Sequence, residues 1–420
     1  MPFYAAPGVY VEEVPSGARP IGAVGTSTAA FIGTAPDAGA ARGKAVACNN
    51  WTEFTKVFAS NEDAQGTALS RAVWGFFGNG GGRCWIVNVP EGEPIQGGGR
   101  PRSGLELFEE IDEIAIVAAP GYTGAENYEA LLAHCERCGD RVAILDPDPR
   151  IADVSRLVEV ATASGSRRSG GGSSASDEES GSGSGGRSGG GSGASAEPAG
   201  GLPRESKFGA FYFPWIWAYD TLSRQTVETA PSGHIAGVWA RVDTSRGVHK
   251  APANEVLAYA TDLTYGITRQ EQELLNPKGV NCIRKFGSQG IKVWGARMRV
   301  EEAHEFRYIN VRRLFLMLIE SIAQGTDWIV FEPNDYTLWT SIRTEIGNFL
   351  TRVWRDGALL GRTPEEAFYV KCDAETNPED VRAAGQVVAY IGVAPVKPAE
   401  FVVFKLSQWV GGAQIETVGG

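Results

Sequence analysis

Residues 114–145, IAIVAAPGYTGAENYEALLAHCERCGDRVAIL, decide the fold class of this chain. Residues 114–118 and 141–145 are short, continuous apolar runs, which are typical of strands buried on both faces. Between them, residues 127–138 place apolar side chains at helical spacing. The stretch therefore predicts a strand, a helix and a second strand, which is the parallel βαβ unit of an α/β sheet.

The sequence on either side extends this pattern in both directions. Helical periodicity predicts helices at 50–58, 68–77, 235–243, 311–324 and 336–355. Apolar and β-branched runs predict strands at 29–33, 84–89, 208–216, 280–283, 291–295, 328–331, 367–372 and 401–406. Asn50 with Glu53, and Thr363 with Glu366, have the spacing of capping boxes at helix starts.

Residues 164–201 interrupt the α/β pattern with a run of almost pure Gly and Ser. Such a segment buries too little apolar surface to offset the entropy of ordering it. Because both flanks resemble the same α/β domain, we interpret the run as a disordered surface insertion. We expect it to project outward and its removal to spare assembly.

The bulk composition excludes several classes of function. The formal net charge of −11 argues against nucleic-acid binding, which needs a basic surface. The 6 cysteines are irregularly spaced, so we expect reduced thiols rather than a disulfide framework. The first residues lack a signal-peptide pattern and no apolar run is long enough to cross a membrane. We therefore expect synthesis in the cytoplasm and no membrane insertion.

No group of residues makes a convincing catalytic or metal site. The pair Cys135 and Cys138 beside His134 has no second pair of ligands, and the helical pattern turns Cys135 toward a core. The glycine runs 78–82 and 97–99 fit no phosphate-binding motif. A capping or surface role is expected for the histidines, such as His234 and His304. We expect no catalytic residue, no cofactor and no metal, and hence no enzyme.

The opening stretch GVYVEEVPSG, residues 8–17, alternates like a strand but has no hairpin partner nearby. Val9, Val11 and Glu13 share one face, and Tyr10, Glu12 and Val14 share the other. A strand cannot leave its backbone groups unpaired once it is buried. Its partners are therefore expected outside its own local sequence.

Taken in order, several stretches resemble the tail sheath proteins of contractile phage tails and phage-tail-like bacterial injection systems. They are PGVYVEEV, AAFIGTA, PSGHIAGVWARVDTSRGVHKAPAN, NPKGVNCIRKFGSQGIKVWGARM, YINVRRLFLMLIESI, WIVFEPND, LWTSIRTEIGNFLTRVWRDGALLG, TPEEAFYVKCD and PAEFVVFKL. They cover the last 190 residues almost continuously, together with the first 35.

The resemblance implies a structural subunit that polymerises with itself as stacked hexameric rings around an inner tube protein. Such a sheath contracts when a baseplate triggers it and drives the tube through a target envelope, and a terminal cap protein is a further partner. The implied location is a phage tail or a phage-tail-like injection particle. The N-terminal and C-terminal extensions would be strands donated to neighbouring subunits.

The resemblance also implies how the chain is divided. We expect an N-terminal strand arm and tether at 1–20 and an outer α/β domain at 21–265 that carries the insertion. An inner α+β sheath domain would occupy 266–408, followed by a C-terminal extension at 409–420. The fold class is therefore α/β and α+β multidomain.

Four sets of residues are candidates for contacts between subunits or with the tube. The donated strands would use Val9, Tyr10, Val11, Glu12, Glu13 and Val14 at the start, and Phe401, Val402, Val403, Phe404, Lys405, Leu406, Ile415 and Val418 at the end. Glu365 and Glu366 are candidates for facing the tube, against the alternative of a surface turn. Arg312 and Arg313 oppose the dipole of their helix and so suggest fixed carboxylate partners, in a neighbouring element or subunit, or else a solvated pair.

Two other classes of function remain as alternatives. A non-catalytic soluble binding module would be a monodisperse monomer, whereas a sheath subunit would form polymers or tubes. An α/β enzyme would need a glycine-rich turn after a strand and an acidic residue about 20 positions later. The turn at 118–127, AAPGYTGAEN, lacks that spacing.

Overall fold

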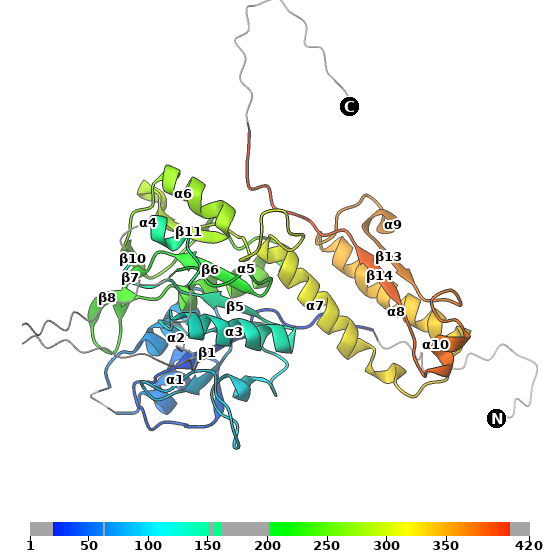
Figure 1. Cartoon of the computed structure of the whole chain (residues 1–420), viewed down its shortest axis with the longest axis horizontal. Coiled ribbons are helices and arrows are strands. Elements are labelled where there is room, and N and C mark those ends of the chain that lie inside the picture. The colour runs from blue at the N-terminus through cyan, green and yellow to red at the C-terminus, as the bar shows by residue number, and fades with distance from the viewer. Residues whose placement is uncertain (1–19, 62–63, 152–153, 162–200, 404–420) are drawn as a thin grey trace, which may run out of the picture.

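The computed structural model describes residues 20–61, 64–151, 154–161 and 201–403, and these form two lobes (Figure 1). The larger lobe is built on a mixed sheet, and the smaller one on two helices and a hairpin. Helix α7 (Ile309–Gly325) runs from the larger lobe into the smaller one.

The central sheet has nine strands in the order β2-β3-β1-β4-β5-β6-β11-β12-β9. The central six, β3, β1, β4, β5, β6 and β11, run parallel, and the edge strands pair antiparallel. The strands are β1 (Ala29–Gly33), β2 (Ala45–Cys48), β3 (Cys84–Asn88), β4 (Ile116–Ala118), β5 (Val142–Leu145), β6 (Gly209–Phe213), β9 (Glu255–Val256), β11 (Val280–Lys285) and β12 (Ile291–Trp294). Strands β4 and β5 are parallel neighbours, which confirms the predicted βαβ unit.

Helices cover both faces of this sheet, as alternate side chains of β6 show. Phe211 faces Tyr128 of α3 (Ala125–Cys138), with ring centroids 6.2 Å apart. The next residue, Tyr212, accepts a hydrogen bond from Trp239 Nε1 of α5 (Ser232–Arg246) at 3.0 Å. Because successive strand residues point to opposite faces, α3 and α5 lie on opposite sides.

Helix α2 (Ala68–Gly78) packs directly on α5, and two glycines make this approach possible. A Cβ at Gly233 would lie 2.3 Å from Ala72 Cα, and a Cβ at Gly75 would lie 2.2 Å from His234 Nδ1. The remaining helical elements of this lobe are α1 (Trp51–Phe58), α4 (Val154–Leu157), α6 (Arg269–Leu275), η1 (Gly104–Phe108), η2 (Asn276–Lys278) and η3 (Gly287–Gln289).

A three-stranded antiparallel sheet, in the order β10-β7-β8, lies at one end of the large lobe. It comprises β7 (Ile216–Asp220), β8 (Gln225–Thr229) and β10 (Ala260–Leu263). The single strand predicted at 208–216 is therefore two strands, β6 and β7, that belong to different sheets. Pro214 lies between them and has no N–H to donate to a ladder.

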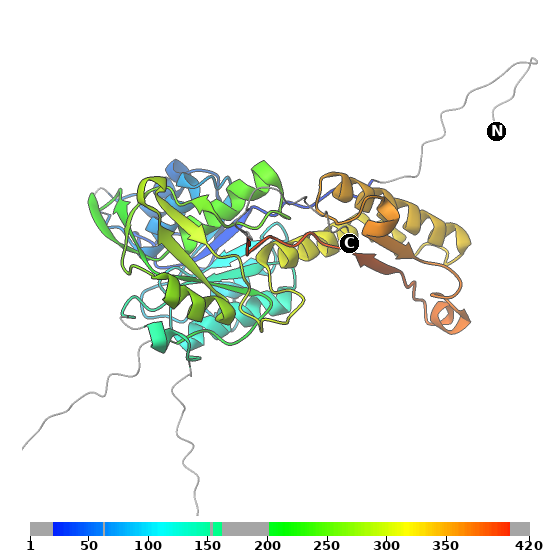
Figure 2. The same ribbon diagram turned by 90° about the horizontal axis from the view of Figure 1, so that it is seen from above.

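The smaller lobe packs α8 (Tyr336–Arg355) against a two-stranded antiparallel sheet of β13 (Phe368–Lys371) and β14 (Tyr390–Val393) (Figure 2). The short elements η4 (Asp327–Ile329), α9 (Pro364–Ala367) and α10 (Glu379–Ala383) complete it. Its core is separate from that of the large lobe and includes Ile21, Leu314, Leu318, Ile346, Phe349 and Leu350. Helix α7 contributes to both cores, because Ile309 and Leu316 belong to the core of the large lobe.

Several predicted boundaries need correction. Strands β11 and β12 belong to the nine-stranded sheet, so a boundary between residues 265 and 266 does not separate the two cores. Residues 328–331 form the end of a 3₁₀ helix and a turn instead of a strand. Thr363 precedes α9 as expected, but its side chain makes no capping hydrogen bond. Among the described residues, no helix is both long and apolar enough to cross a membrane.

Candidate functional site

Two segments near the ends of the described chain accept hydrogen bonds from buried arginines of the body, and we take them as the candidate functional site. Residues 20–28 form the N-terminal anchor, and residues 394–400 form the C-terminal anchor. The red end of the described chain crosses back from the small lobe toward the large one (Figure 1).

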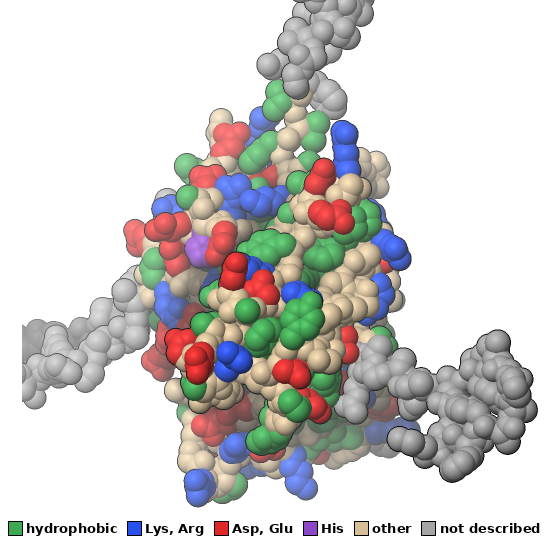
Figure 3. Space-filling view, turned by 90° about the vertical axis from the view of Figure 1, so that its right-hand side faces the viewer, with side chains coloured by type: hydrophobic (Ala, Val, Ile, Leu, Met, Phe, Trp, Pro, Cys, Tyr) green, Lys and Arg blue, Asp and Glu red, His purple; other side chains and the backbone are tan. Residues whose placement is uncertain are grey.

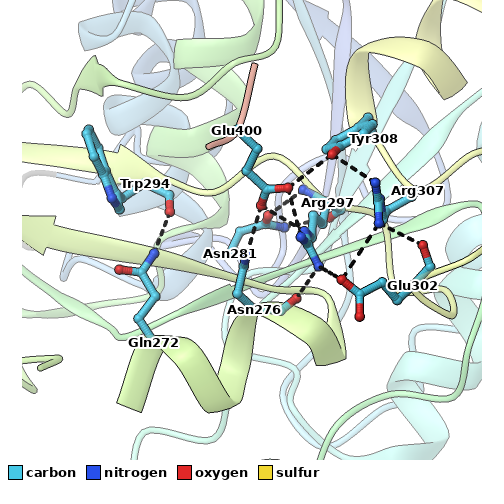
Figure 4. A network of polar contacts seen from close by, with 9 residues as sticks. All are labelled: Gln272, Asn276, Asn281, Trp294, Arg297, Glu302, Arg307, Tyr308 and Glu400. Atoms are coloured by element: carbon cyan, nitrogen blue, oxygen red, sulfur yellow. Dashed lines mark hydrogen bonds and ion pairs between the residues drawn. The ribbon is translucent and has the colours of Figure 1, made fainter. Parts of the chain in front are cut away.

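Glu400 fixes the C-terminal anchor to the large lobe through both of its carboxylate oxygens (Figure 4). Arg297 donates from Nε to Oε1 and from Nη2 to Oε2, each at 2.8 Å. Asn276 Nδ2 donates to Oε1 at 2.8 Å, and the Tyr308 hydroxyl donates to Oε2 at 3.1 Å. A bidentate Arg–carboxylate pair with two further donors is a strong and directional contact.

Contacts of its own backbone hold Arg297 in place independently of Glu400. Its backbone N–H donates to Asn281 Oδ1 at 2.6 Å, and its carbonyl accepts from Asn281 Nδ2 at 2.8 Å. Asn281 is fully buried in β11, and Gly295 allows the backbones to approach, because a Cβ there would lie 2.8 Å from Asn281 Cα. The guanidinium is therefore preorganised, with its side chain only 3% exposed.

The environment keeps the Glu400 carboxyl ionised. Burial raises its pKa, but the hydrogen bonds from Arg297 and Asn276 outweigh burial and leave the pKa below its usual range. The anchor is thus fully charged at neutral pH. It loses its charge only as the pH falls through that lowered value.

A second contact holds the same segment a few residues earlier. Val396 N–H donates to the Ala358 carbonyl at 3.1 Å, and Asn310 Nδ2 donates to the Val396 carbonyl at 3.2 Å. Beyond Glu400, residues 401–403 are exposed and have no secondary structure. Glu400 is therefore the last anchored residue of the described C-terminal segment.

The N-terminal anchor ties residues 20–28 to both lobes. Ile21 is buried in the small-lobe core and lies against Gly325, where a Cβ would approach its side chain to 2.7 Å. Val24 N–H donates to Ser321 Oγ at 3.0 Å. The Thr26 hydroxyl donates to Asp243 Oδ2 at 2.6 Å, just before β1 enters the large sheet.

Arg313 joins this N-terminal anchor to both lobes from α7. Its Nη1 and Nη2 donate to Asp243 Oδ1 and Oδ2 at 2.9 Å and 2.5 Å, and Nη2 also donates to the Thr26 carbonyl at 2.8 Å. Its guanidinium lies 4.7 Å from the ring centroid of Trp239. Arg313 is thus paired within its own chain, which corrects the expectation of an ion pair to another subunit and supports the neighbouring-element alternative.

Arg312 has a different environment. Its guanidinium lies 4.3 Å from the ring centroid of Phe208 and 5.0 Å from that of Phe306. The residue is 5% exposed, and the described part of the chain offers its Nε no hydrogen-bond partner and its guanidinium no ion pair. Burial lowers the pKa of Arg312 to about 10. Its Nε is thus buried without a hydrogen-bond acceptor in the described chain, while two aromatic rings and the charge of Glu305 act on the guanidinium.

The β13–β14 sheet has two edges that pair with no other strand of the described residues. Two-stranded sheets are marginally stable on their own, and open edges present unpaired N–H and C=O groups. Tyr369, Tyr390 and Ile391 are exposed on this hairpin. Hydrophobic side chains gather in the middle of the small-lobe face, among charged ones (Figure 3).

The other predicted site residues have mixed outcomes. The described residues do not include the insertion up to residue 200. They also do not include Val9–Val14, Phe404, Lys405, Leu406, Ile415 and Val418. Phe401, Val402 and Val403 are described and exposed, and they form no strand with the described residues. Glu365 and Glu366 are exposed on α9, and Glu366 accepts a hydrogen bond from the Arg362 N–H at 2.7 Å. Their role toward a tube stays a prediction.

The expectation that His234 has a capping or surface role is wrong. It is fully buried, neither ring nitrogen has a hydrogen-bond partner in the described chain, and burial lowers its pKa to about 4. His304 does fit that expectation, because it is exposed and its Nδ1 accepts from the Phe306 N–H at 3.0 Å.

The large sheet adds no observation in favour of the enzyme hypothesis. Its carboxyl edge is where α/β proteins bind ligands. Asp146, just after β5, is buried there and accepts hydrogen bonds from the Ser232 N–H at 2.8 Å and its hydroxyl at 2.7 Å. Cys135 is buried as expected, and the described residues contain no cluster of His, Cys, Asp or Glu that could hold a metal.

Two family models match the chain. The phage tail sheath protein central domain matches residues 204–297, and the phage tail sheath C-terminal domain matches residues 301–408. These matches, which meet near residue 300, agree with the observed division between the cores better than a boundary at 265 and confirm the resemblance drawn from the sequence.

Curated relatives agree with these models. The tail sheath protein of Salmonella phage ViI is 27% identical over 197 residues, which cover 46% of this chain and 30% of that protein. The tail sheath protein of Vibrio phage KVP40 is 29% identical over 193 residues, covering 44% of this chain and 27% of that protein. The chain thus spans less than a third of the length of these relatives.

Solved structures match over nearly the whole chain. The sheath complex of an extracellular contractile injection system, PVC, in its contracted state has a TM-score of 0.72 at 26% identity, covering 98% of this chain and 99% of that chain. The helical sheath of the anti-feeding prophage (AFP), also contracted, has a TM-score of 0.70 at 28% identity, covering 97% of this chain and 100% of that chain.

Proposed function

We propose, from the premise that this chain carries the central and C-terminal domains of phage tail sheath proteins, that it is the sheath subunit of a contractile phage-tail-like injection particle. The observation that carries the proposal is the full-length likeness to chains of the PVC and AFP sheaths, which matches both lobes and not only the α/β sheet. The subunits would polymerise around an inner tube and contract to drive it through a target envelope.

Stacked hexameric rings are the proposed assembly. A baseplate structure of the anti-feeding prophage, reconstructed with 6-fold symmetry, contains a chain that matches 97% of this one at a TM-score of 0.70. Inner tube, baseplate and terminal cap proteins are the partners proposed from this likeness. The particle would assemble from subunits made in the bacterial cytoplasm.

We propose the β13–β14 hairpin as the acceptor of the donated strands. It has two open edges among the described residues, and the chain has two terminal segments outside them. Residues 404–420, if fully extended, reach at most about 55–60 Å, which is enough to cross to a neighbouring subunit. Main-chain ladders would then link subunits through contacts that depend little on side-chain fit.

The two anchors support a separation between the subunit body, which moves, and the terminal arms, which connect subunits. Ile21 and Thr26 tie the start of the N-terminal arm to both lobes, and Glu400 ties the start of the C-terminal arm to the large lobe. The bodies can therefore move during contraction while each arm leaves its own subunit at a defined point.

Two further contacts are proposed, one with a neighbouring subunit and one with the tube. Arg312, whose buried Nε has no acceptor in the described chain, would donate to a carboxylate of a neighbouring copy, because a buried charge with an unsatisfied donor is costly. The exposed pair Glu365 and Glu366 would face the tube.

Electron microscopy of the purified chain, alone and with its tube and baseplate partners, tests the proposed function. Sheath-like tubes with six-fold symmetry are expected. Monodisperse monomers under all these conditions would instead support the alternative of a soluble binding module.

A further inference from the structure

We propose that Glu400 and Glu302 are alternative acceptors for Arg297, and that exchange between them sets the length of the C-terminal tether. The exchange is a property of the single chain. Its consequence for contraction rests on the proposed function.

In the observed state Nε and Nη2 of Arg297 hold Glu400, while Nη1 donates to the Asn276 carbonyl at 3.1 Å and lies 3.7 Å from Glu302. Both carboxylate oxygens accept from the guanidinium at 2.8 Å, and the Glu400 side chain is 20% exposed. Asn276 and Tyr308 add two further donors to the same carboxylate. Tension on residues 401–403 would act on this contact first, because it is the last one of the described segment.

Glu302 is positioned to replace Glu400. Its Oε1 lies 3.7 Å from Arg297 Nη1 and 3.7 Å from Arg307 Nη1, and its side chain is 60% exposed (Figure 4). It lies in the turn between Arg297 and α7, and its carboxylate is exposed. Arg297 is 3% exposed, and a cation this deeply buried is costly without a partner. A second carboxylate in reach lowers that cost when Glu400 leaves.

Release of Glu400 would lengthen the tether by a defined amount. The next upstream contact of the segment is Val396, held by Ala358 and Asn310. Residues 397–400 would then be freed, and four residues at about 3.4 Å each add up to about 14 Å of reach. The body of a subunit could thus move away from a donated strand without breaking the strand's own ladder.

Pulsed electron–electron resonance on the full chain tests the first part. Spin labels at V402C and Y219C, both exposed sites, report the distance from the tether to the large lobe. A C138S background removes the one cysteine that is not buried. E400Q is expected to broaden the distance distribution by up to about 14 Å.

A matched control distinguishes the anchor from a general charge effect. E205Q removes an exposed carboxylate 3.6 Å from another buried arginine, Arg299. It is expected to leave the distribution as narrow as in the wild type. An E400Q distribution that equals those of the wild type and E205Q would overturn the proposal.

A double-mutant cycle tests the exchange itself. E302Q alone is expected to change the melting temperature little, because Glu400 still holds Arg297. In E400Q, Glu302 takes over, so the double variant should lose at least about 2 °C more than the two single losses combined. Strict additivity would show that Glu302 does not replace Glu400 and would overturn the exchange.

Both measurements use unassembled protein, so their failure is distinguishable from failure of the proposed function. In assembled particles, E400Q is expected to contract, because its tether is already released. E205Q is expected to contract as the wild type does. If the wild-type chain forms no sheath, the proposed function fails while the two single-chain results still stand or fall alone.

Discussion

Replacing Asp243 with Asn should destabilise the chain strongly, because Asp243 is the carboxylate that joins the N-terminal anchor to α7. It accepts two hydrogen bonds from Arg313 and one from Thr26, and the two charged side chains are 4% and 3% exposed. Removing one partner of a buried pair typically costs about 3–5 kcal/mol. Asn keeps the shape, and Arg313 keeps the Thr26 carbonyl and the Trp239 ring, so we expect about 3 kcal/mol.

Urea unfolding followed by circular dichroism measures this change at fixed pH. The matched control is E273Q, which breaks the Arg269–Glu273 pair, whose side chains are 88% and 65% exposed. Exposed pairs contribute little, so E273Q should cost less than about 0.5 kcal/mol. The double variant D243L/R313M, which replaces the whole pair by apolar side chains, should recover much of the loss.

The reasoning is refuted if D243N costs less than about 1 kcal/mol or no more than E273Q. Such a result would mean that Arg313 finds enough compensation from Thr26 and Trp239 alone. The N-terminal anchor would then depend on Ile21 and Val24 instead of on the buried ion pair.

Three further outcomes are expected. Burial lowers the pKa of His234 to about 4, whereas its unfolded value is near 6.5. The contribution of His234 to the free energy of unfolding is therefore full above pH 6.5 and falls by up to about 3 kcal/mol as the pH drops to 4. H234M should remove this contribution from the pH dependence of unfolding, and an unchanged pH dependence would contradict it. Replacing residues 164–200 by a short Gly/Ser link should leave the melting temperature unchanged, because Ala161 and Leu202 already pair across the insertion at 2.7 Å; a large drop would show that the insertion is structural. R312L should not destabilise the free chain but should weaken assembly seen by sedimentation, whereas equal assembly would remove the proposed inter-subunit carboxylate.

Local pattern was enough to predict the elements whose apolar residues face a core. Helix α8 begins and ends at the predicted residues because Leu338, Ile342, Ile346 and Phe349 repeat at helical spacing and are all buried. Residues 328–331, WIVF, were wrongly predicted as a strand because part of this apolar run faces no core. Val330 and Phe331 are exposed, so their β-branched and aromatic character has no strand partner to act on.

Sheet membership and the anchors depend on contacts between distant residues and could not be read locally. Strand β11 was predicted as a strand, but its pairing with β6 bridges about 70 positions and decides where the domains divide. Arg297 and Glu400 are 103 residues apart, and although both lie in stretches that resemble sheath proteins, nothing in the local sequence pairs them. His234 was misplaced because a polar side chain suggests a surface, whereas Gly75 leaves room for it in the α2–α5 contact.

The resemblance in the sequence was confirmed over residues 204–408, but the donated strands were not. The N-terminal strand residues lie outside the described part, and residues 401–403 are unpaired there. For the described residues 401–403, the lack of a strand partner is what a segment donated to another chain would show in a single copy.

Helical reconstruction of the assembled polymer by cryo-electron microscopy tests the central claim most directly. We predict that the β13–β14 hairpin of each subunit carries one additional strand on each edge, one from residues 8–14 and one from residues 401–406, both supplied by neighbouring copies. A hairpin with bare edges, or one completed by the terminal segments of its own chain, would contradict the account.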